Sequence, residues 1–212
     1  GLTLTESGSC TVRGNAEMLR QLAENLAANA VQHCKEGGEI TVTAEGKKLS
    51  IANPYAGELI SFGTAEYEVV GPVQGAGYGD ANSHSIMIRM RNGSDTFLFT
   101  GDATGEETDD ILEAGMNVSA DVYKAAHHGS ANDGCNSPEF LNAVSPRFAV
   151  ISCGYHNEHG HPHVETMELL KETGCEVFRT DLQGTVTCVS HGNGSYDWSV
   201  EPTDNYANGN SL

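Results

Sequence analysis

Positive charge is scarce in this chain. Its 212 residues include 11 Lys and Arg against 29 Asp and Glu, so the formal net charge is −18 at pH 7. A protein face that binds nucleic acid broadly neutralises phosphates with clustered Lys and Arg. The composition therefore argues against such a face. It is compatible with a small phosphoester substrate held on metal ions, or with a protein partner.

Long apolar runs and closely paired cysteines are also missing. No stretch approaches the roughly 18 consecutive apolar residues of a membrane span, and the start lacks the basic and apolar pattern of a secretion signal. The six cysteines are widely spaced without a Cys-x-x-Cys pair. Because a chain of this length can bury a core without cross-links, we expect reduced, mostly buried thiols. These absences together predict a soluble, cytoplasmic chain without a membrane segment.

The first 57 residues differ in pattern from the remainder. Residues 16–33 place apolar side chains on one face at helical spacing, between a Gly-Asn start and a Gly-Gly stop, which predicts an amphipathic helix. Residues 39–44 and 48–52 alternate in polarity around a Glu-Gly-Lys turn. This alternation predicts a hairpin, so we expect a helix-plus-hairpin segment over 1–57.

Four short motifs stand out in residues 3–54. They are Val12-Arg13-Gly14-Asn15, Glu24-Asn25-Leu26, Asn29-Ala30-Val31-x-His33 and Gly38-Glu39-Ile40-Thr41-Val42. The segment resembles the N-terminal part of the ATP-binding domain of sensor histidine kinases, which implies that Asn29 helps to hold magnesium under nucleotide phosphates. That family's Asp-x-Gly-x-Gly box and Gly-rich lid are missing after Pro54. The alternative is a helix packed on a hairpin, in which Asn25 and Asn29 are merely polar.

From residue 58 onward, short strands alternate with helices. The expected strands lie at 60–70, 85–91, 96–100, 149–153, 176–180 and 185–190, and the expected helices at 105–115, 138–144 and 163–173. Residues 191–212 are rich in Asn, Gly and Ser and have little apolar content. We therefore expect an α/β domain over 58–190, followed by a flexible tail.

Metal-binding residue types follow three of the apolar strands. Asp102 ends the segment 97–102, and His127 and His128 lie in the segment 122–130. Side chains at the carboxyl edge of a buried strand converge with those of its neighbours, so these residues could meet around one cation. A further group follows the strand at 149–153 and consists of His156, His159, His161 and His163.

Several motifs in this region occur together and in one order. They are Asn82-x-x-Ser85, Phe99-Thr100-Gly101-Asp102, Lys124-x-x-His127-His128-Gly129-Ser130, Ser137-x-Glu139-Phe140-Leu141, Val150-Ile151-Ser152, Gly160-His161-Pro162-His163 and Phe178-Arg179-Thr180. Residues 62–190 thereby resemble the metallo-β-lactamase fold, specifically the hydrolase-like domain of bacterial DNA-uptake competence proteins. The resemblance implies part of an αββα sandwich and a metal-dependent hydrolase of phosphoesters.

The resemblance also implies roles for individual residues. Asp102 would bridge two divalent cations, Zn²⁺ or Mn²⁺, and His127 or His128 would complete a coordination shell, so that a metal-bound hydroxide attacks phosphorus or a carbonyl. His161 or His163 would contact the leaving group or a substrate phosphate. The catalytic set is then Asp102, His128 and His161, the metal set Asp102, His127 and His128, and the substrate-binding set Ser130, His163, Asn82 and Ser85.

Each of these roles has a simpler structural alternative. Asp102 could be the N-cap of the helix that begins near Gly105. His127 and His128 could hydrogen-bond the turn that follows them. Asn82 and Ser85 could form a turn.

One motif of the resembled enzymes is absent from the sequence. They carry a His-x-His-x-Asp-His loop upstream of the other motifs, and this chain has no such string. The chain therefore resembles a mosaic, in which residues 1–57 would have to cover the sheet face that the missing half of the sandwich normally buries. Two functions follow: a hydrolase with an incomplete metal site, or a noncatalytic acidic interaction protein.

Overall fold

The computed structural model describes residues 54–63 and 65–209. The helix expected over 16–33, the hairpin over 39–52 and the candidate nucleotide ligand Asn29 lie outside these residues. The resemblance of residues 3–54 to a kinase domain therefore stays a prediction.

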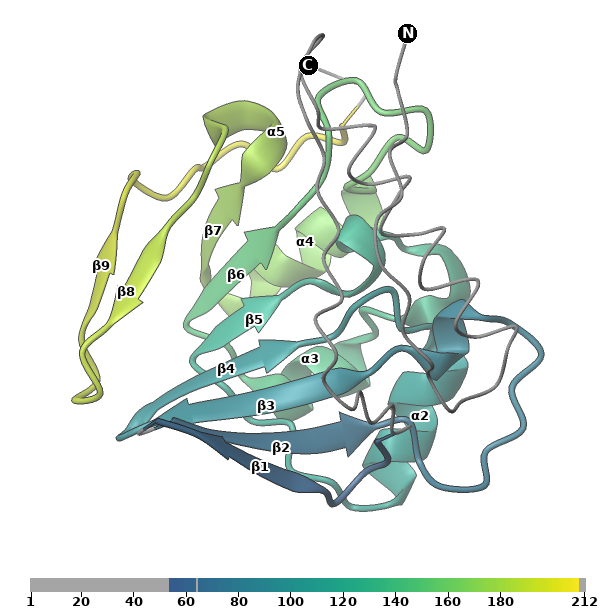
Figure 1. The fold of residues 1–212 in the computed structure, drawn as a ribbon. Helices are drawn as coiled ribbons and strands as arrows, with labels where there is room; N and C mark the ends of the chain where they lie inside the picture. The colour runs from purple at the N-terminus through teal and green to yellow at the C-terminus, as the bar shows by residue number, and fades with distance from the viewer. Residues whose placement is uncertain (1–53, 64, 210–212) are drawn as a thin grey trace, which may run out of the picture. The chain divides into compact units, whose positions relative to one another are not determined.

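A seven-stranded mixed sheet forms the centre of the described part, with its strands in chain order across the sheet (Figure 1). The strands are β1 (Leu59–Phe62), β2 (Ala65–Gly71), β3 (Met87–Asn92), β4 (Asp95–Phe99), β5 (Val122–Lys124), β6 (Phe148–Ile151) and β7 (Glu176–Arg179). Strands β1 to β4 pair antiparallel, and β4 to β7 pair parallel. The expected α/β class is confirmed, and the sheet is mixed.

Three helices cover one face of the sheet. They are α2 (Gly105–Glu113), α3 (Pro138–Val144) and α4 (Val164–Thr173), and a fourth, α5 (Thr180–Gln183), follows β7. Ile111 of α2, Phe140 of α3 and Leu170 of α4 share one buried core with Leu98 and Tyr123 of the sheet. The parallel order follows from this layering, because each helix returns the chain to the start of the next strand. No helix within the described residues is long and apolar enough to cross a membrane.

A two-stranded sheet packs on the opposite face of the large sheet. It consists of β8 (Cys188–Ser190) and β9 (Tyr196–Trp198), which pair antiparallel. The Trp198 ring stacks on Phe178 of β7 at 4.0 Å between centroids, and Tyr196 meets the edge of Phe148 at 5.4 Å. Where composition favoured a flexible tail after residue 190, the structure forms a strand. The physical reason is that Tyr196, Trp198 and Val200 alternate with polar residues and bury one face of the hairpin.

Asp95 fastens this hairpin to the turn between β3 and β4. Its fully buried carboxylate accepts hydrogen bonds from the Ser190 hydroxyl at 2.6 Å and from the amides of Gly192 and Gly194 at 2.8 and 2.6 Å. Burial acts to raise the pKa of Asp95, but these hydrogen bonds outweigh it, and the pKa is lowered. A Cβ at Gly93 would collide with the Gly192 carbonyl, so glycine is required where the two turns cross.

We predict that Asp95→Ala lowers the free energy of unfolding by about 2–4 kcal/mol, because a carboxylate with several charge-assisted hydrogen bonds is lost from a buried position. Urea unfolding at pH 7 measures the change. Asp109→Ala, which removes an exposed carboxylate from α2, is the matched control. Equal stability of the two variants would contradict a fastening role for Asp95.

Candidate functional site at the carboxyl edge of the parallel strands

The loops that leave β4, β5 and β6 carry the predicted site residues to one edge of the sheet. Asp102 follows β4, and His127 and His128 lie in a short 3-10 segment, Ala126–Gly129, directly after β5. Residues 152–163 lead from β6 to α4. Because these strands are parallel, their carboxyl ends share an edge, and the expected convergence of aspartate and histidines takes place there.

Asp102 and His128 form the central pair of the site. Asp102 Oδ1 lies 3.2 Å from His128 Nε2, and both side chains are 42% exposed. The other ring nitrogen, Nδ1, lies 2.6 Å from the carbonyl oxygen of Ser152 and orients the imidazole. The hydrogen bond from His128 lowers the pKa of Asp102, and the same bond raises the pKa of His128.

The N-cap alternative for Asp102 is not what the structure shows. The N-cap of α2 is Thr104, whose side chain makes no capping hydrogen bond. The Asp102 carboxylate instead faces His128, and its backbone amide donates to the Ser85 hydroxyl oxygen at 3.1 Å. The loop therefore places Asp102 toward His128.

His127 and His128 adopt left-handed backbone conformations. Their φ angles are 45° and 58°, and Gly129 follows at 80°. Left-handed geometry costs a residue with a Cβ about 1 kcal/mol, so the surrounding contacts must impose it. The His127 amide donates to the Gly101 carbonyl at 3.2 Å, and the Gly129 carbonyl accepts from the His163 amide at 3.0 Å. Strain of this kind is typical of functional sites.

His161 lies at the centre of a histidine cluster. Its ring centroid is 4.8 Å from that of His163, 5.6 Å from those of His127 and His159, and 6.2 Å from that of His128. The His161 side chain is 6% exposed. Burial, followed by the neighbouring imidazoles, lowers its pKa to about 4. His161 is therefore neutral at pH 7.

The donor chemistry of this cluster suits a divalent cation only in part. The Nδ1 atom of His127 is buried without a hydrogen-bond partner in the described part of the chain, so no described protein group engages this ring nitrogen. Asp102 and His128 supply a carboxylate and an imidazole beside it. However, no three His, Cys, Asp or Glu side chains among the described residues are grouped closely enough to hold a metal ion.

The other predicted residues occupy supporting positions. Ser130 is fully buried, and its hydroxyl oxygen accepts from the Asn132 amide at 3.1 Å. His163 is the N-cap residue of α4, and its Nδ1 accepts from the Ala131 amide at 3.0 Å. Ser85 holds the Asp102 loop, and Asn82 begins a short 3-10 turn, Asn82–His84. In this structure these side chains shape the loops around the cluster.

Sequence reasoning missed two charged residues near the site. The Lys124 ammonium donates to the Gly101 carbonyl at 3.0 Å and so braces the Asp102 loop. Glu107 is fully buried on α2, and a Cβ at Gly71 would lie 2.9 Å from its Oε1. Burial raises the pKa of Glu107 to about 8. Glu107 lies four positions before Ile111, so helical spacing places it on the same buried face, and this spacing could have indicated its burial.

A cavity of about 510 Å³ opens beside the histidine cluster. Its lining includes Asn132, Ser137, Pro138, His163, Glu165 and Leu169. His163 belongs both to this lining and to the cluster around His161, so a ligand in the cavity would lie next to the site.

Comparison with known proteins gives partial matches to longer chains. The chain is 28% identical over 148 residues to ComE operon protein 3 of Bacillus subtilis, which covers 70% of this chain and 19% of that protein. It is 35% identical over 108 residues to competence protein ComA of Neisseria gonorrhoeae, covering 50% and 15%. The same identity extends over 105 residues of recombination protein 2 of Haemophilus influenzae, covering 50% and 13%. No protein-family model matches the chain.

The matched relatives include bacterial competence proteins. This result supports the competence-protein part of the resemblance. The chain spans less than a fifth of the length of each relative, so the activity of a whole competence protein does not transfer to it directly.

We predict that Glu107→Gln removes a pH dependence of stability. With a pKa of about 8 in the folded chain against 4.5 in the unfolded chain, Glu107 binds its proton only in the folded state between these values. Stability of the parent chain should therefore fall as the pH rises from 5 through 8, by on the order of 2 kcal/mol. Urea unfolding at pH 5, 7 and 9 measures this slope.

The matched control is Glu106→Gln, which changes an exposed carboxylate on the same helix. It should keep the slope of the parent chain. If the Glu107→Gln chain shows the same slope as this control, the buried carboxyl does not titrate as expected.

Proposed function

We propose that this chain is a metal-dependent, hydrolase-like domain that acts on phosphoesters within a DNA-uptake system. Similarity to competence proteins supports the DNA-uptake role. The observation that carries the hydrolase part is the Asp102–His128 pair at the edge of the parallel strands, with the unpartnered His127 nitrogen beside it. We further propose a fold of metallo-β-lactamase type, supported by a mixed sheet with helices on one face and a β-hairpin on the other.

Asp102, His127 and His128 would hold the cation, Zn²⁺ or Mn²⁺. A bound divalent ion supplies Lewis-acid chemistry, that is, polarisation of a phosphoryl oxygen and stabilisation of developing negative charge. Oxygen and imidazole donors suit both metals. The Ser152 carbonyl fixes the orientation of the His128 ring, as carbonyl partners commonly do for metal-binding histidines.

The remaining residues would orient the substrate. Because the pKa of His161 is lowered to about 4, its ring is neutral at pH 7. A neutral imidazole can donate its N–H group to a phosphate oxygen or to a leaving group. His163 connects the cluster with the adjacent cavity, which could receive the rest of the phosphoester. Lys124 and Ser85 would keep the Asp102 loop in place.

A noncatalytic interaction protein is the second candidate. The absence of a three-residue metal group within the described residues favours it, together with the net charge of −18. In that case the acidic surface would face a protein partner, and the histidine cluster would be structural.

We predict that the chain, stripped with chelator and reloaded separately with Mn²⁺ and Zn²⁺, retains about one to two equivalents of metal, and that Asp102→Ala loses them. Elemental analysis after gel filtration measures the metal content. Asp109→Ala, which removes an exposed carboxylate from α2, should retain the metal of the parent chain.

Hydrolysis of a chromogenic phosphodiester by the reloaded chain would then test the activity. Metal content near zero in the parent chain would rule out the hydrolase and leave the interaction protein. Metal retained by Asp102→Ala would place the cation elsewhere.

A further inference from the structure

The C-terminal segment Thr203–Gly209, called here the strap, joins β7 to the loop that carries His161. At its start, the Thr203 amide donates to the Val177 carbonyl at 2.8 Å. At its end, the Gly209 amide donates to the carbonyls of Pro162 and Gly160 at 3.1 and 3.3 Å. A segment distant in sequence therefore reaches the backbone on both sides of a candidate catalytic histidine.

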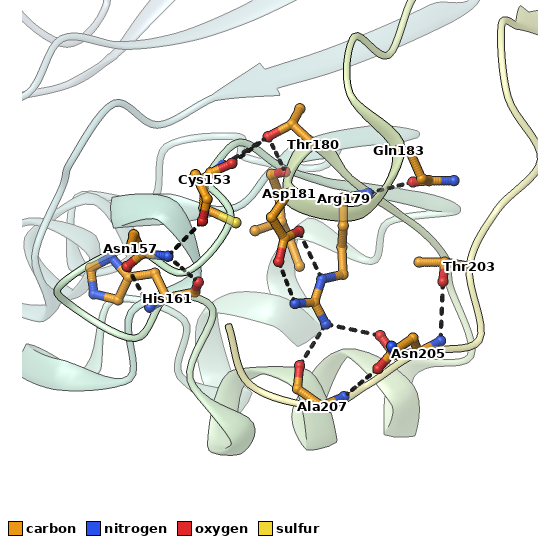
Figure 2. A network of polar contacts seen from close by, with 12 residues as sticks. Cys153, Asn157, His161, Arg179, Thr180, Asp181, Gln183, Thr203, Asn205 and Ala207 are labelled. Carbon is orange, nitrogen blue, oxygen red and sulfur yellow. Dashed lines mark hydrogen bonds and ion pairs between the residues drawn. The ribbon is translucent and has the colours of Figure 1, made fainter. Parts of the chain in front are cut away.

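Arg179 holds the middle of the strap (Figure 2). Its guanidinium is fully buried, and Asp181 accepts from Nε at 3.1 Å and from Nη2 at 2.7 Å. The Nη1 atom donates to the carbonyls of Asn205 and Ala207. A buried guanidinium has five N–H donors to satisfy, and the strap accepts two of the four side-chain hydrogen bonds described for Arg179.

The end of the strap lies directly against the backbone of His161. A Cβ at Gly209 would collide with the His161 carbonyl. On the other side, Asn157 accepts from the His161 amide at 2.9 Å and donates to its carbonyl at 2.6 Å, as Figure 2 shows. The backbone of His161 is thus held between its own loop and the strap.

The loop that carries His161 also contacts the turn that carries His127 and His128. The His163 amide donates to the Gly129 carbonyl, and a Cβ at Gly129 would lie 2.8 Å from Pro162 Cβ. Displacing the loop would therefore release one of the contacts that impose the left-handed turn at His127 and His128.

We propose that the strap is a positioning element of the site: it holds His161 in the cluster, and through Pro162 and His163 it holds the turn that presents His127 and His128. The inference rests on the proposed function for its effect on metal and substrate. Its effect on the loop itself does not depend on that function.

The test uses Gly209→Val and the milder Gly209→Ala in the full chain, because any Cβ at this position should push the strap away from His161. Asn157→Ala, which loosens the same loop from inside, is the positive control. Asp204→Ala, which changes an exposed side chain of the strap, is the negative control. Amide hydrogen exchange measured by NMR should become on the order of tenfold faster at His161 and His163 in the Gly209 variants.

A second measurement separates positioning from general stability. Paramagnetic broadening of the His161 ring signal by added Mn²⁺ should decrease in both Gly209 variants, while exchange at Leu98 and Tyr123 in the sheet stays unchanged. If exchange and broadening in both variants match those of Asp204→Ala, the strap does not position His161. Exchange that rises equally in the sheet would also overturn the proposal.

The two proposals can fail separately. If the parent chain binds no Mn²⁺ and hydrolyses no phosphodiester, the proposed function fails, while faster exchange confined to the loop would still establish the strap. If the parent chain binds Mn²⁺ and the Gly209 variants bind it equally well with unchanged exchange, the strap proposal fails alone.

Discussion

The left-handed turn at His127 and His128 is the constraint on which the site depends. Two successive residues with a Cβ do not adopt this backbone unaided, because the Cβ crowds the following carbonyl. The turn forms where Gly101 of the preceding loop accepts its first amide and where the loop before α4 donates to Gly129. Three strand exits must therefore be correctly placed before the histidine pair can face Asp102. The parallel pairing of β4, β5 and β6 provides that placement.

Two buried charged residues, Asp95 and Arg179, form hydrogen bonds with segments far away in the sequence. Asp95 accepts hydrogen bonds from the β8–β9 hairpin, and Arg179 donates hydrogen bonds to carbonyls of the strap. Backbone groups from a distant segment provide part of the hydrogen bonding of each buried charge, so each charge joins two segments that are far apart in the sequence. Glu107 differs from both, since its buried carboxylate oxygens have no hydrogen-bond partner within the described residues and burial raises its pKa. With a pKa of about 8, this carboxyl is mostly protonated at pH 7 and carries no charge that needs a partner.

The relatives and the histidine cluster give different kinds of information about this chain. The similarity to competence proteins covers at most 70% of this chain and a small part of each relative, so it identifies a related segment of a larger protein. The geometry adds the chemistry: a carboxylate, imidazoles and a neutral buried histidine beside a cavity. The sequence lacks the His-x-His-x-Asp-His loop. Consistent with this, no three potential metal-binding side chains are grouped among the described residues. An interaction role therefore remains the alternative to catalysis.

Periodicity in the sequence was enough to predict most elements and the edge of the sheet where the site lies. The strands before Asp102 and His127 are short and apolar, the helices at 138–144 and 163–173 have clear start and stop signals, and these features are local. The sequence could not show that His161 is the buried centre of the cluster, whereas His156 instead contacts Tyr155. It also could not show that Asp102 faces His128 in preference to capping α2, or that residues 196–209 pack on the body of the domain. Those outcomes were decided by the tertiary structure, because they depend on which distant backbone groups meet each side chain, and local pattern carries no information about such contacts.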